Sequence, residues 1–394
     1  MPKKRVLMLM LEVGFGHKAP ANAVKEAMEA QYPGRFRIDV VDFAREVGAL
    51  ADDKVIKNGW DLALAFPLSA RIGYLWMELN RRNLSYIDVI YKDFIEKGMA
   101  YIAEKKPDLI FATHALCLYI AGRARRELGV VAPVVAYVVD PFDGYSLWAD
   151  ENADKILVAT EQSRKRLIDH GIADSKILRT GFPINNSFFD VKKSAAQIVE
   201  ELGLVPGRPT LLVSAGGQGI GKVFSFVEAA HRLQLPLNIV TVAGKNQRTK
   251  TRMERLAEGK SETRLVPLGY VTNMNELIRA CDVVVGKSGA STFMEAVFME
   301  RPVILTEWAT YNDWYIINFA LDNDVGWYCP SVISFLGTLR KLIEPGALDP
   351  FASRIAALGM KPGADEVASF LAGLAARGQP APPHDRSASQ PNIR

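Results

Sequence analysis

Apolar residues follow two alternating patterns along the chain. Short runs rich in aliphatic and β-branched residues alternate with longer segments whose apolar residues recur every three or four positions. The short runs are typical of buried strands, and the longer segments are typical of amphipathic helices. In the first half the predicted strands are Val6–Met10, Arg37–Val41, Leu109–Ala112, Val134–Val139 and Ile156–Ala159.

The helices predicted in the first half are Ala21–Gln31, Ser85–Lys105, Leu116–Glu127 and Glu161–His170. The same alternation of strands and helices begins again in the second half of the chain. The strands predicted in the second half are Thr210–Ser214, Asn238–Ala243, Arg264–Pro267, Val283–Val285 and Val303–Thr306. Alternating strands and helices form parallel sheets covered on both faces. The pattern therefore predicts an α/β protein of two Rossmann-like domains, joined by the charged and Pro/Gly-punctuated segment near 188–208.

Composition narrows the function classes. A chain of 394 residues is long enough for two domains, and 49% hydrophobic with 23% charged residues is globular composition. A net charge of +4 is too small to indicate nucleic-acid binding, but it suits a protein that visits an anionic surface. Cys117, Cys281 and Cys329 fit neither a disulfide framework nor a zinc cluster, which predicts a reducing cytoplasm.

The two ends of the chain are interpreted from their apolar content. The start, MPKKRVLMLMLEVGFG, is basic, but its apolar run is short and Glu12 interrupts it, so we expect a buried strand rather than a signal peptide. No stretch approaches the roughly 18 apolar residues of a membrane-spanning helix, so any membrane contact is expected to be peripheral. Residues 378–394 lack apolar periodicity and predict a disordered tail.

A glycine-rich turn, GFGHKA, follows the first predicted strand. It matches the dinucleotide-binding fingerprint loosely, and Asp42 could supply the acidic residue expected after the second strand. Phe15 and His17 argue against a nicotinamide site, because their bulky side chains crowd the place where the cofactor phosphates would approach the turn. The alternatives are a plain strand–helix turn with a solvent-facing histidine, or a loop in which His17 is a general base, kept neutral by the helix N-terminus.

Two further glycine-rich turns open helices in the second half, where backbone N–H groups can bind an anion. One lies in LLVSAGGQGIGKV at 211–223, and the other is GKSGAST at 286–292, followed by Glu295. A carboxylate at that place can accept both hydroxyls of a ribose while the loop binds a diphosphate. The simpler alternative is a Ser/Thr cap followed by a helical glutamate.

The three turns, in this order, resemble the monogalactosyldiacylglycerol synthase and processive diacylglycerol glucosyltransferase family. The resemblance runs from about Val6 to about Gly326. It rests on GFGHKAPANAVKEA, VSAGGQGIGKV, LGYVTNMNELIRACDVVVGKSGASTFMEAVFMERPVILTEW, KKPDLIFATHALCLYIAGRARREL, VVAYVVDPF and ILRTGFPINNSFF. It implies an inverting, metal-independent GT-B glycosyltransferase, with two Rossmann-like domains facing across a cleft. The implied reaction moves a hexose from a UDP-sugar to a diacylglycerol-like lipid, with no cofactor besides the donor.

The resemblance also implies roles for individual residues. Glu295 is expected to bind the ribose, and the backbone of Tyr270 and Val271 to meet the uracil. The loops expected around the donor phosphates contain Gly216, Gly217, Gly219, Lys287, Ser288, Gly289, Ala290 and Ser291. Facing the acceptor is the loop of Gly14, Phe15, Gly16 and His17. Either His17 or Asp140, at the end of another strand, is the expected base, with Asp140 otherwise orienting His17.

Departures from the family pattern leave the sugar open. Phe15 replaces the middle one of three glycines, and KSGAST replaces KAGPGT. Where the family has a Pro-Gly-Gln-Glu segment at the donor sugar, this chain has ATYNDWY, so Asn312 and Asp313 stand in with side chains one methylene shorter. Two alternatives remain: a nucleotide-sugar epimerase or hydrolase on the same fold, and a sensor that binds the donor without turnover.

Segment 53–91 combines aromatic residues with cations. The residues concerned are Trp60, Phe66, Tyr74 and Trp76, with Lys54, Lys57, Arg71, Arg81 and Arg82. This mixture predicts a shallowly inserted interfacial segment, and the alternative is a helical insertion packed in the core. We therefore expect a cytoplasmic protein, peripheral at the membrane's cytoplasmic face, with a nucleotide sugar, a lipid acceptor and an anionic membrane surface as partners. The expected regions are an acceptor domain at 1–190, a donor domain at 205–345, C-terminal helices at 346–377 that pack toward the first domain, and the tail.

Overall fold

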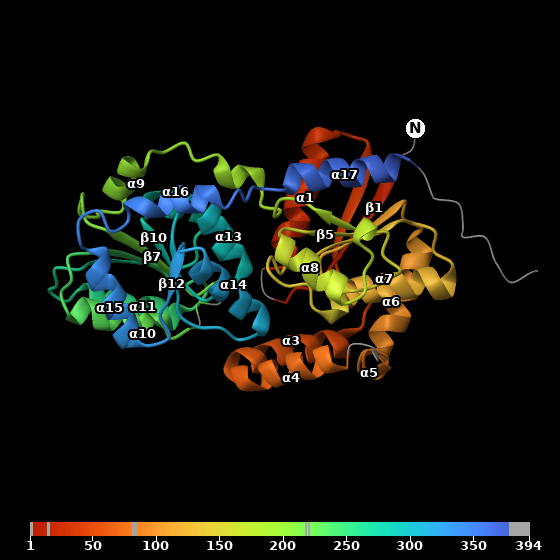
Figure 1. Ribbon diagram of the computed structural model, residues 1–394, viewed down its shortest axis with the longest axis horizontal. Coiled ribbons are helices and arrows are strands. Elements are labelled where there is room, and N and C mark those ends of the chain that lie inside the picture. Colours follow the sequence, from red (N-terminus) through yellow and green to blue (C-terminus); the bar gives the residue numbers. More distant parts are fainter. Residues whose placement is uncertain (1–2, 14–15, 81–84, 217–218, 220, 378–394) are drawn as a thin grey trace, which may run out of the picture.

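The protein folds around two parallel six-stranded sheets, as a computed structural model shows (Figure 1). The structure describes residues 3–13, 16–80, 85–216, 219 and 221–377. The first sheet has the order β2-β1-β3-β4-β5-β6. Its strands are β1 (Lys4–Met10), β2 (Phe36–Asp42), β3 (Leu109–Ala112), β4 (Val134–Tyr137), β5 (Lys155–Val158) and β6 (Ile177–Arg179).

The second sheet has the order β12-β11-β10-β7-β8-β9. Its strands are β7 (Thr210–Ser214), β8 (Asn238–Val242), β9 (Arg264–Leu268), β10 (Val283–Gly286), β11 (Val303–Leu305) and β12 (Gly326–Tyr328). Both sheets are buried between helices because their strands are almost continuously apolar. The predicted pair of parallel α/β sheets is confirmed.

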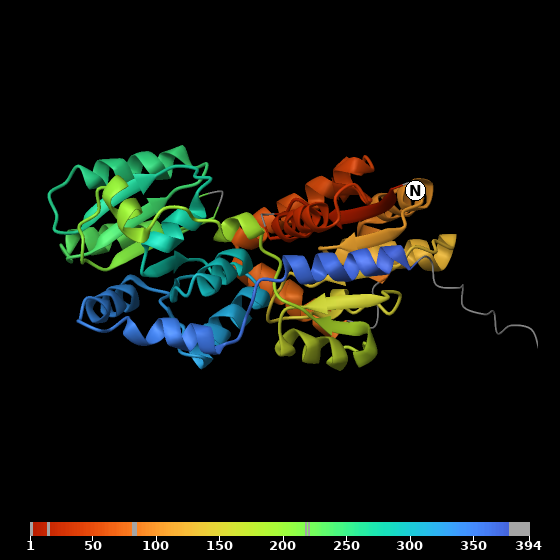
Figure 2. The same cartoon turned by 90° about the horizontal axis from the view of Figure 1, so that it is seen from above.

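Helices cover both faces of each sheet (Figures 1 and 2). Around the first sheet lie α1 (Lys18–Gln31), α2 (Phe43–Glu46), α5 (Ser85–Ile90), α6 (Lys92–Lys105), α7 (Ala115–Leu128) and α8 (Glu161–Asp169). The segment between the sheets contains α9 (Ala195–Glu201). Around the second sheet lie α10 (Val223–Arg232), α11 (Gln247–Ala257), α12 (Met274–Ala280), α13 (Ala290–Phe298), α14 (Tyr311–Asp322), α15 (Val332–Leu342) and α16 (Asp349–Ala357).

The last helix, α17 (Ala364–Ala376), crosses back to the first domain and lies beside α1 (Figure 1). Phe182 and Pro362 form an isolated parallel bridge just before it. The side chain of Gln31 on α1 donates a hydrogen bond of 2.8 Å to Asp365. The chain therefore connects the two domains twice, once through the α9 segment and once through the approach to α17.

A helical hairpin of α3 (Leu50–Ala65) and α4 (Pro67–Leu79) projects from the first domain below the second (Figure 1). None of the residues of α4 is fully buried. Leu68, Ile72, Leu75 and Leu79, which share one face of α4, are between 46% and 85% exposed. Within the described residues, no helix is long and apolar enough to cross a membrane.

Candidate active site

The first group of predicted residues meets at the carboxyl edge of the first sheet. The connections from β1 and β3 leave in opposite directions, and such a switch point is where open α/β sheets bind ligands. His17 directly precedes α1 after β1, and His114 caps the N-terminus of α7 after β3. The two imidazole ring centroids are 4.5 Å apart. The topology therefore brings together two histidines that are distant in sequence.

The hydrogen-bond partners determine the tautomers of the two histidines. Nδ1 of His17 lies 2.6 Å from the carbonyl oxygen of Thr113, which can only accept, so Nδ1 carries the hydrogen and Nε2 has a free lone pair. Nδ1 of His114 accepts a hydrogen bond from the backbone N–H of Leu116, so its Nε2 carries the hydrogen. Burial lowers the pKa of His17, although the bond to Thr113 opposes this. The pair thus offers a neutral base beside an N–H donor.

Asp140 follows β4 at the same edge. Its Oδ2 accepts a hydrogen bond of 3.2 Å from Nε1 of Trp148. Burial raises the pKa of Asp140, and hydrogen bonding by the side chains of Asn312 and Trp148 opposes that rise. Asp140 was expected to orient His17. In the structure, the backbone carbonyl of Thr113 instead accepts the hydrogen bond from Nδ1 of His17.

The second group lies at the carboxyl edge of the other sheet, where β7 and β10 form its switch point. Gly216 and Gly219 both have left-handed backbones, and a Cβ on Gly219 would lie 1.8 Å from the carbonyl oxygen of Ala243. Glycine is thus the residue that fits this turn. Gly217 lies outside the described residues.

The loop after β10 presents a cation beside a helix N-terminus. Burial lowers the pKa of Lys287, and the nearby carboxylates of Glu307 and Asp313 oppose this. Ser288 is buried and uses both its N–H and its hydroxyl to bond the carbonyl of Glu307. Gly289 caps α13 without a side chain, so α13 begins with N–H groups that no cap covers. The arrangement suits an anion.

Two buried side-chain oxygens near this helix have no hydrogen-bond partner among the described residues. They are Oγ of Ser291, in the first turn of α13, and Oε1 of Glu307. Burial raises the pKa of Glu295, one turn further along α13, to about 7. Glu307 was missed from the sequence, although it follows β11 directly and polar residues after parallel strands commonly face ligands.

Asn312 and Asp313, the two residues predicted to contact the donor sugar, make different contacts. Oδ2 of Asp313 accepts the backbone N–H groups of Ala309 and Thr310 at 2.8 and 3.2 Å, which caps α14. Burial raises the pKa of Asp313 to about 6. Asn312 instead lies near enough to Asp140, on the first domain, to lower the pKa of its carboxyl. The two carboxyl edges approach each other here, and the ring of Phe142 stacks on that of Phe319 on α14 at 4.0 Å.

The predicted acceptor and membrane residues fall in different environments. Gly14, Phe15 and the side chain of Trp60 lie outside the described residues, and Gly16 is half-buried beside His17. Phe66 and Trp76 are exposed on the hairpin. Tyr74 corrects the expectation of a row of membrane anchors, because its hydroxyl donates to Asp143 at 2.6 Å and its ring lies 5.2 Å from that of Tyr311.

The predicted uracil-binding turn follows β9. Tyr270 is exposed, and its ring lies 5.9 Å from Nζ of Lys245. Val271 is half-buried and packs against the core. The ring of Tyr270 remains accessible to a ligand.

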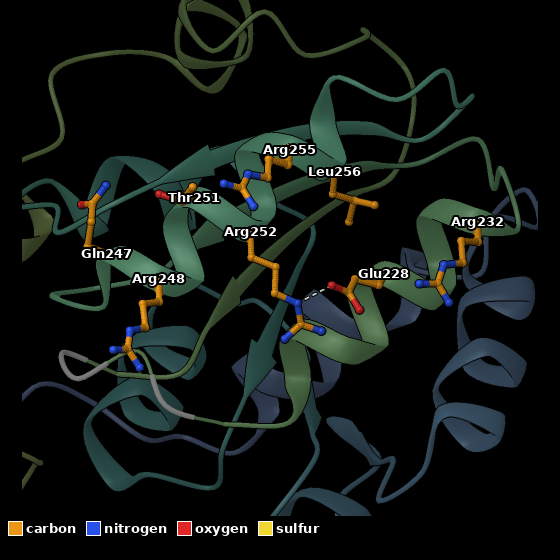
Figure 3. A pocket seen from close by; sticks show the side chains of 8 residues that line it. All are labelled: Glu228, Arg232, Gln247, Arg248, Thr251, Arg252, Arg255 and Leu256. Atoms are coloured by element: carbon orange, nitrogen blue, oxygen red, sulfur yellow. Dashed lines mark hydrogen bonds and ion pairs between the residues drawn. The ribbon is translucent and has the colours of Figure 1, made fainter.

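A depression of about 580 Å³ lies elsewhere, between α10 and α11 (Figure 3). Its charged lining consists of Glu228, Arg232, Arg248, Arg252 and Arg255. Glu228 pairs with Arg252. The predicted site residues do not line it. In the described part of the chain, no three His, Cys, Asp or Glu side chains are grouped as a metal ion would require.

Two family profiles match the chain. The profile of monogalactosyldiacylglycerol (MGDG) synthase covers residues 17–184, and that of the glycosyltransferase family 28 C-terminal domain covers residues 210–313. Both profiles describe glycosyltransferases, and together they identify the chain as a glycosyltransferase. The first profile spans β2 to β6 of the first sheet and the second spans β7 to β11 of the second, so each domain matches a different profile.

Relatives agree with this assignment at low identity. The chloroplastic monogalactosyldiacylglycerol synthase of Spinacia oleracea is 23% identical over 87% of this chain and 67% of its own length. The processive diacylglycerol beta-glucosyltransferase of Bacillus mycoides is 30% identical, over 55% of this chain and 54% of its own. The chain thus spans about two thirds of the plant protein and about half of the bacterial one.

Solved structures show the same fold. Acinetobacter baumannii MurG superimposes with a TM-score of 0.62 at 16% identity, covering 94% of this chain and 99% of that protein. The UDP-GlcNAc 2-epimerase of Neisseria meningitidis gives a TM-score of 0.58 at 14% identity, covering 95% and 100%. The expected GT-B architecture is confirmed. Because glycosyltransferases and epimerases share it, the architecture alone does not specify the reaction.

Proposed function

We propose that this glycosyltransferase moves a hexose from a UDP-sugar to a lipid with a free hydroxyl, such as diacylglycerol. The observation that carries the proposal is that two different carboxyl edges face each other, with Asn312 near Asp140 and the ring of Phe142 stacked on that of Phe319 at 4.0 Å. One edge holds a neutral histidine base, and the other holds a lysine and an open helix N-terminus. The names of the relatives, a monogalactosyldiacylglycerol synthase and a diacylglycerol glucosyltransferase, support a lipid acceptor.

In this proposal the UDP-sugar lies along the carboxyl edge of the second sheet. Its diphosphate meets the N-terminal N–H groups of α13 and the ammonium of Lys287, which stabilise the charge of the departing UDP without a metal. Glu295, in its ionised form, accepts hydrogen bonds from the ribose hydroxyls. The turn of Tyr270 and Val271 meets the uracil. The glycine turn after β7 allows the donor to approach the backbone closely.

The chemical step takes place between the two edges. Nε2 of His17 removes the proton of the acceptor hydroxyl as its oxygen attacks the anomeric carbon. The bond from that carbon to the UDP oxygen breaks, and UDP leaves with the electron pair. Attack opposite the leaving group inverts the anomeric configuration. Asp140 is the second candidate base, because burial raises the pKa of its carboxyl and it lies at the same edge.

The hairpin of α3 and α4 is proposed to lie on an anionic membrane at its cytoplasmic face. In a helix packed on a protein the apolar face normally points inward, whereas α4 turns Leu68, Ile72, Leu75 and Leu79 outward. A neighbouring face of α4 bonds the protein, with Glu78 accepting from the backbone N–H of Ser146 at 2.8 Å. An exposed apolar stripe of this kind suits insertion at the lipid interface. It would bring a lipid acceptor near the first domain.

A donor and acceptor screen tests the proposal. The protein is incubated with phosphatidylglycerol vesicles containing diacylglycerol and with UDP-galactose, UDP-glucose or UDP-GlcNAc in turn, and the products are identified by mass. We expect a glycosylated diacylglycerol and an equal amount of UDP with at least one donor. Release of free sugar, or interconversion of UDP-sugars without a lipid product, would instead indicate a hydrolase or epimerase. The Glu295→Ala variant is the control for turnover at this site.

A further inference from the structure

Arg71, in the first half of α4, reaches the C-terminal domain. Its Nη2 donates a hydrogen bond of 3.0 Å to the backbone carbonyl of Trp308. Its guanidinium carbon lies 3.2 Å from the centroid of the Trp308 ring. One side chain therefore holds both the backbone and the indole of the same residue. Arg71, expected from the sequence to be a membrane-facing cation, instead contacts the neighbouring domain.

Arginine suits this double contact better than lysine does. Its planar guanidinium can stack on an aromatic face and still direct N–H groups sideways at a carbonyl, whereas the ammonium of lysine is a compact point charge. Nε of Arg71 is buried and has no hydrogen-bond partner among the described residues. Burying that N–H has a cost, which the contacts to Trp308 offset.

Trp308 belongs to the segment that begins α14. Its ring lies 5.0 Å from the ring of Trp314 and 5.8 Å from that of Tyr311. Tyr311 directly precedes Asn312, which meets Asp140 on the facing edge. An aromatic cluster thus connects Arg71 to the residue expected at the donor sugar.

The hairpin is itself fixed to the first domain. Two residues on the same face of α4 as Arg71 make the attachment. The hydroxyl of Tyr74 donates to the buried carboxylate of Asp143 at 2.6 Å, and Glu78 accepts a hydrogen bond of 3.0 Å from Arg166. The helix can therefore transmit the position of the first domain to Trp308.

We propose that Arg71 is a positioning residue, which holds the Trp308–Asn312 segment so that Asn312 faces the donor sugar beside Asp140. This inference rests on the proposed function, because it takes Asn312 as a contact of the transferred hexose. It adds that the hairpin contributes to the donor site as well as to membrane contact. Arg71 touches neither substrate, so its effect passes through Asn312.

A double-mutant cycle tests the proposal. Arg71→Ala, Asn312→Ala and the double variant are compared with the wild type by kcat/KM for transfer and by calorimetric affinities for UDP and for the UDP-hexose. We expect Arg71→Ala to lower kcat/KM about ten- to a hundred-fold, as loss of a charged hydrogen bond and a stacked cation does. The double variant should lose no more than Asn312→Ala alone, since both act on one contact. Arg71→Lys should recover part of the loss.

The affinities for UDP and for the UDP-hexose distinguish a positioning role of Arg71 from a role in folding or in membrane binding. Arg71→Ala should weaken the affinity for the UDP-hexose relative to that for UDP, with vesicle binding unchanged. The matched control is Arg35→Ala, which removes an arginine stacked near Tyr32 and Phe36 on the first domain, and wild-type values are expected. Additive losses in the double variant, or an unchanged affinity ratio in Arg71→Ala, would overturn the role. If no lipid product forms with any protein, the proposed function fails, but the affinity ratio still tests Arg71.

Discussion

The carboxyl edges of the two sheets both lie at a switch in the strand order, but they carry different side chains. Each is a switch point of a six-stranded parallel sheet. At the first edge, backbone groups hold two half-buried imidazoles, His17 and His114, in defined tautomers. At the second edge, Lys287 lies near a helix whose first N–H groups no side chain caps.

The difference shows how one fold can hold both reactants. A proton acceptor needs a lone pair that is neutral at working pH, and burial provides this at His17. A leaving diphosphate needs N–H donors and a cation that the protein has left available. Topology therefore determines where ligands bind, and the residues after each strand determine which ligand binds there.

The strongest test removes the base. We expect His17→Ala to lower kcat about 10²- to 10⁴-fold, the usual contribution of general-base catalysis. Turnover of UDP-hexose with diacylglycerol vesicles measures this, and the midpoint of thermal unfolding checks that the variant is folded. If His17→Ala turned over like the wild type, the base would be assigned to Asp140, and Asp140→Asn would then be expected to show the fall in kcat.

Removal of the carboxylate proposed to bind the ribose should affect the carboxyl edge of the second sheet. For Glu295→Ala we expect the donor KM to rise about 10- to 100-fold, because buried hydroxyls of the ribose lose their acceptor. Initial rates over a range of donor concentrations measure it. Glu344→Ala, an exposed glutamate on the same domain, should keep the wild-type KM. An unchanged KM in Glu295→Ala would remove the ribose assignment.

The exposed apolar face of the hairpin should act at the membrane. We expect the double substitution of Ile72→Asp and Leu75→Asp to lower partitioning onto phosphatidylglycerol vesicles by about tenfold or more, because two exposed apolar contacts become charged. Vesicle co-sedimentation measures this. The control, Ile333→Asp, changes a residue that is 85% exposed on α15 and should bind as the wild type does. Equal losses in both proteins would mean that the hairpin has no special role.

A pH titration should give the smallest effect. Burial raises the pKa of Glu295 to about 7. In the proposed donor site, its ionised form accepts the ribose hydroxyls. Protonation as the pH falls through 7 should therefore raise the Kd for UDP, by up to about tenfold per pH unit below that pKa. Glu295→Gln should lack this component, while protonation of the nucleotide itself affects both proteins equally. Parallel pH profiles would contradict the assignment.

Much of the fold could be predicted because buried parallel strands have continuous apolar sequences. The strands Leu109–Ala112 and Thr210–Ser214 were predicted with their observed bounds. The edge strands β6 and β12 were missed, since their sequences, ILR and GWY, are not continuous aliphatic runs like the VIL of β11. The helix predicted over Ser85–Lys105 is divided at Tyr91 into α5 and α6, and its apolar pattern continues across the break.

The site was harder to predict where partners come from distant segments. The turn glycines and Glu295 can be recognised because their spacing is local. The contact of Arg71 with Trp308 joins residues that are 237 positions apart, and no local pattern predicts it. The hydrogen bond of Tyr74 to Asp143 likewise turned an expected membrane anchor into an internal contact, because an aromatic residue on a helix gives no sign of which face is covered.

The central claim is that the first edge provides the base and the second edge binds UDP. Calorimetric titration of UDP into three proteins tests it most directly. The wild type, His17→Ala and Glu295→Ala are measured under one set of conditions. The account predicts that His17→Ala binds UDP with the wild-type Kd although it does not turn over, and that Glu295→Ala binds UDP about 10- to 100-fold more weakly. Loss of UDP affinity in His17→Ala, together with wild-type affinity in Glu295→Ala, would contradict it.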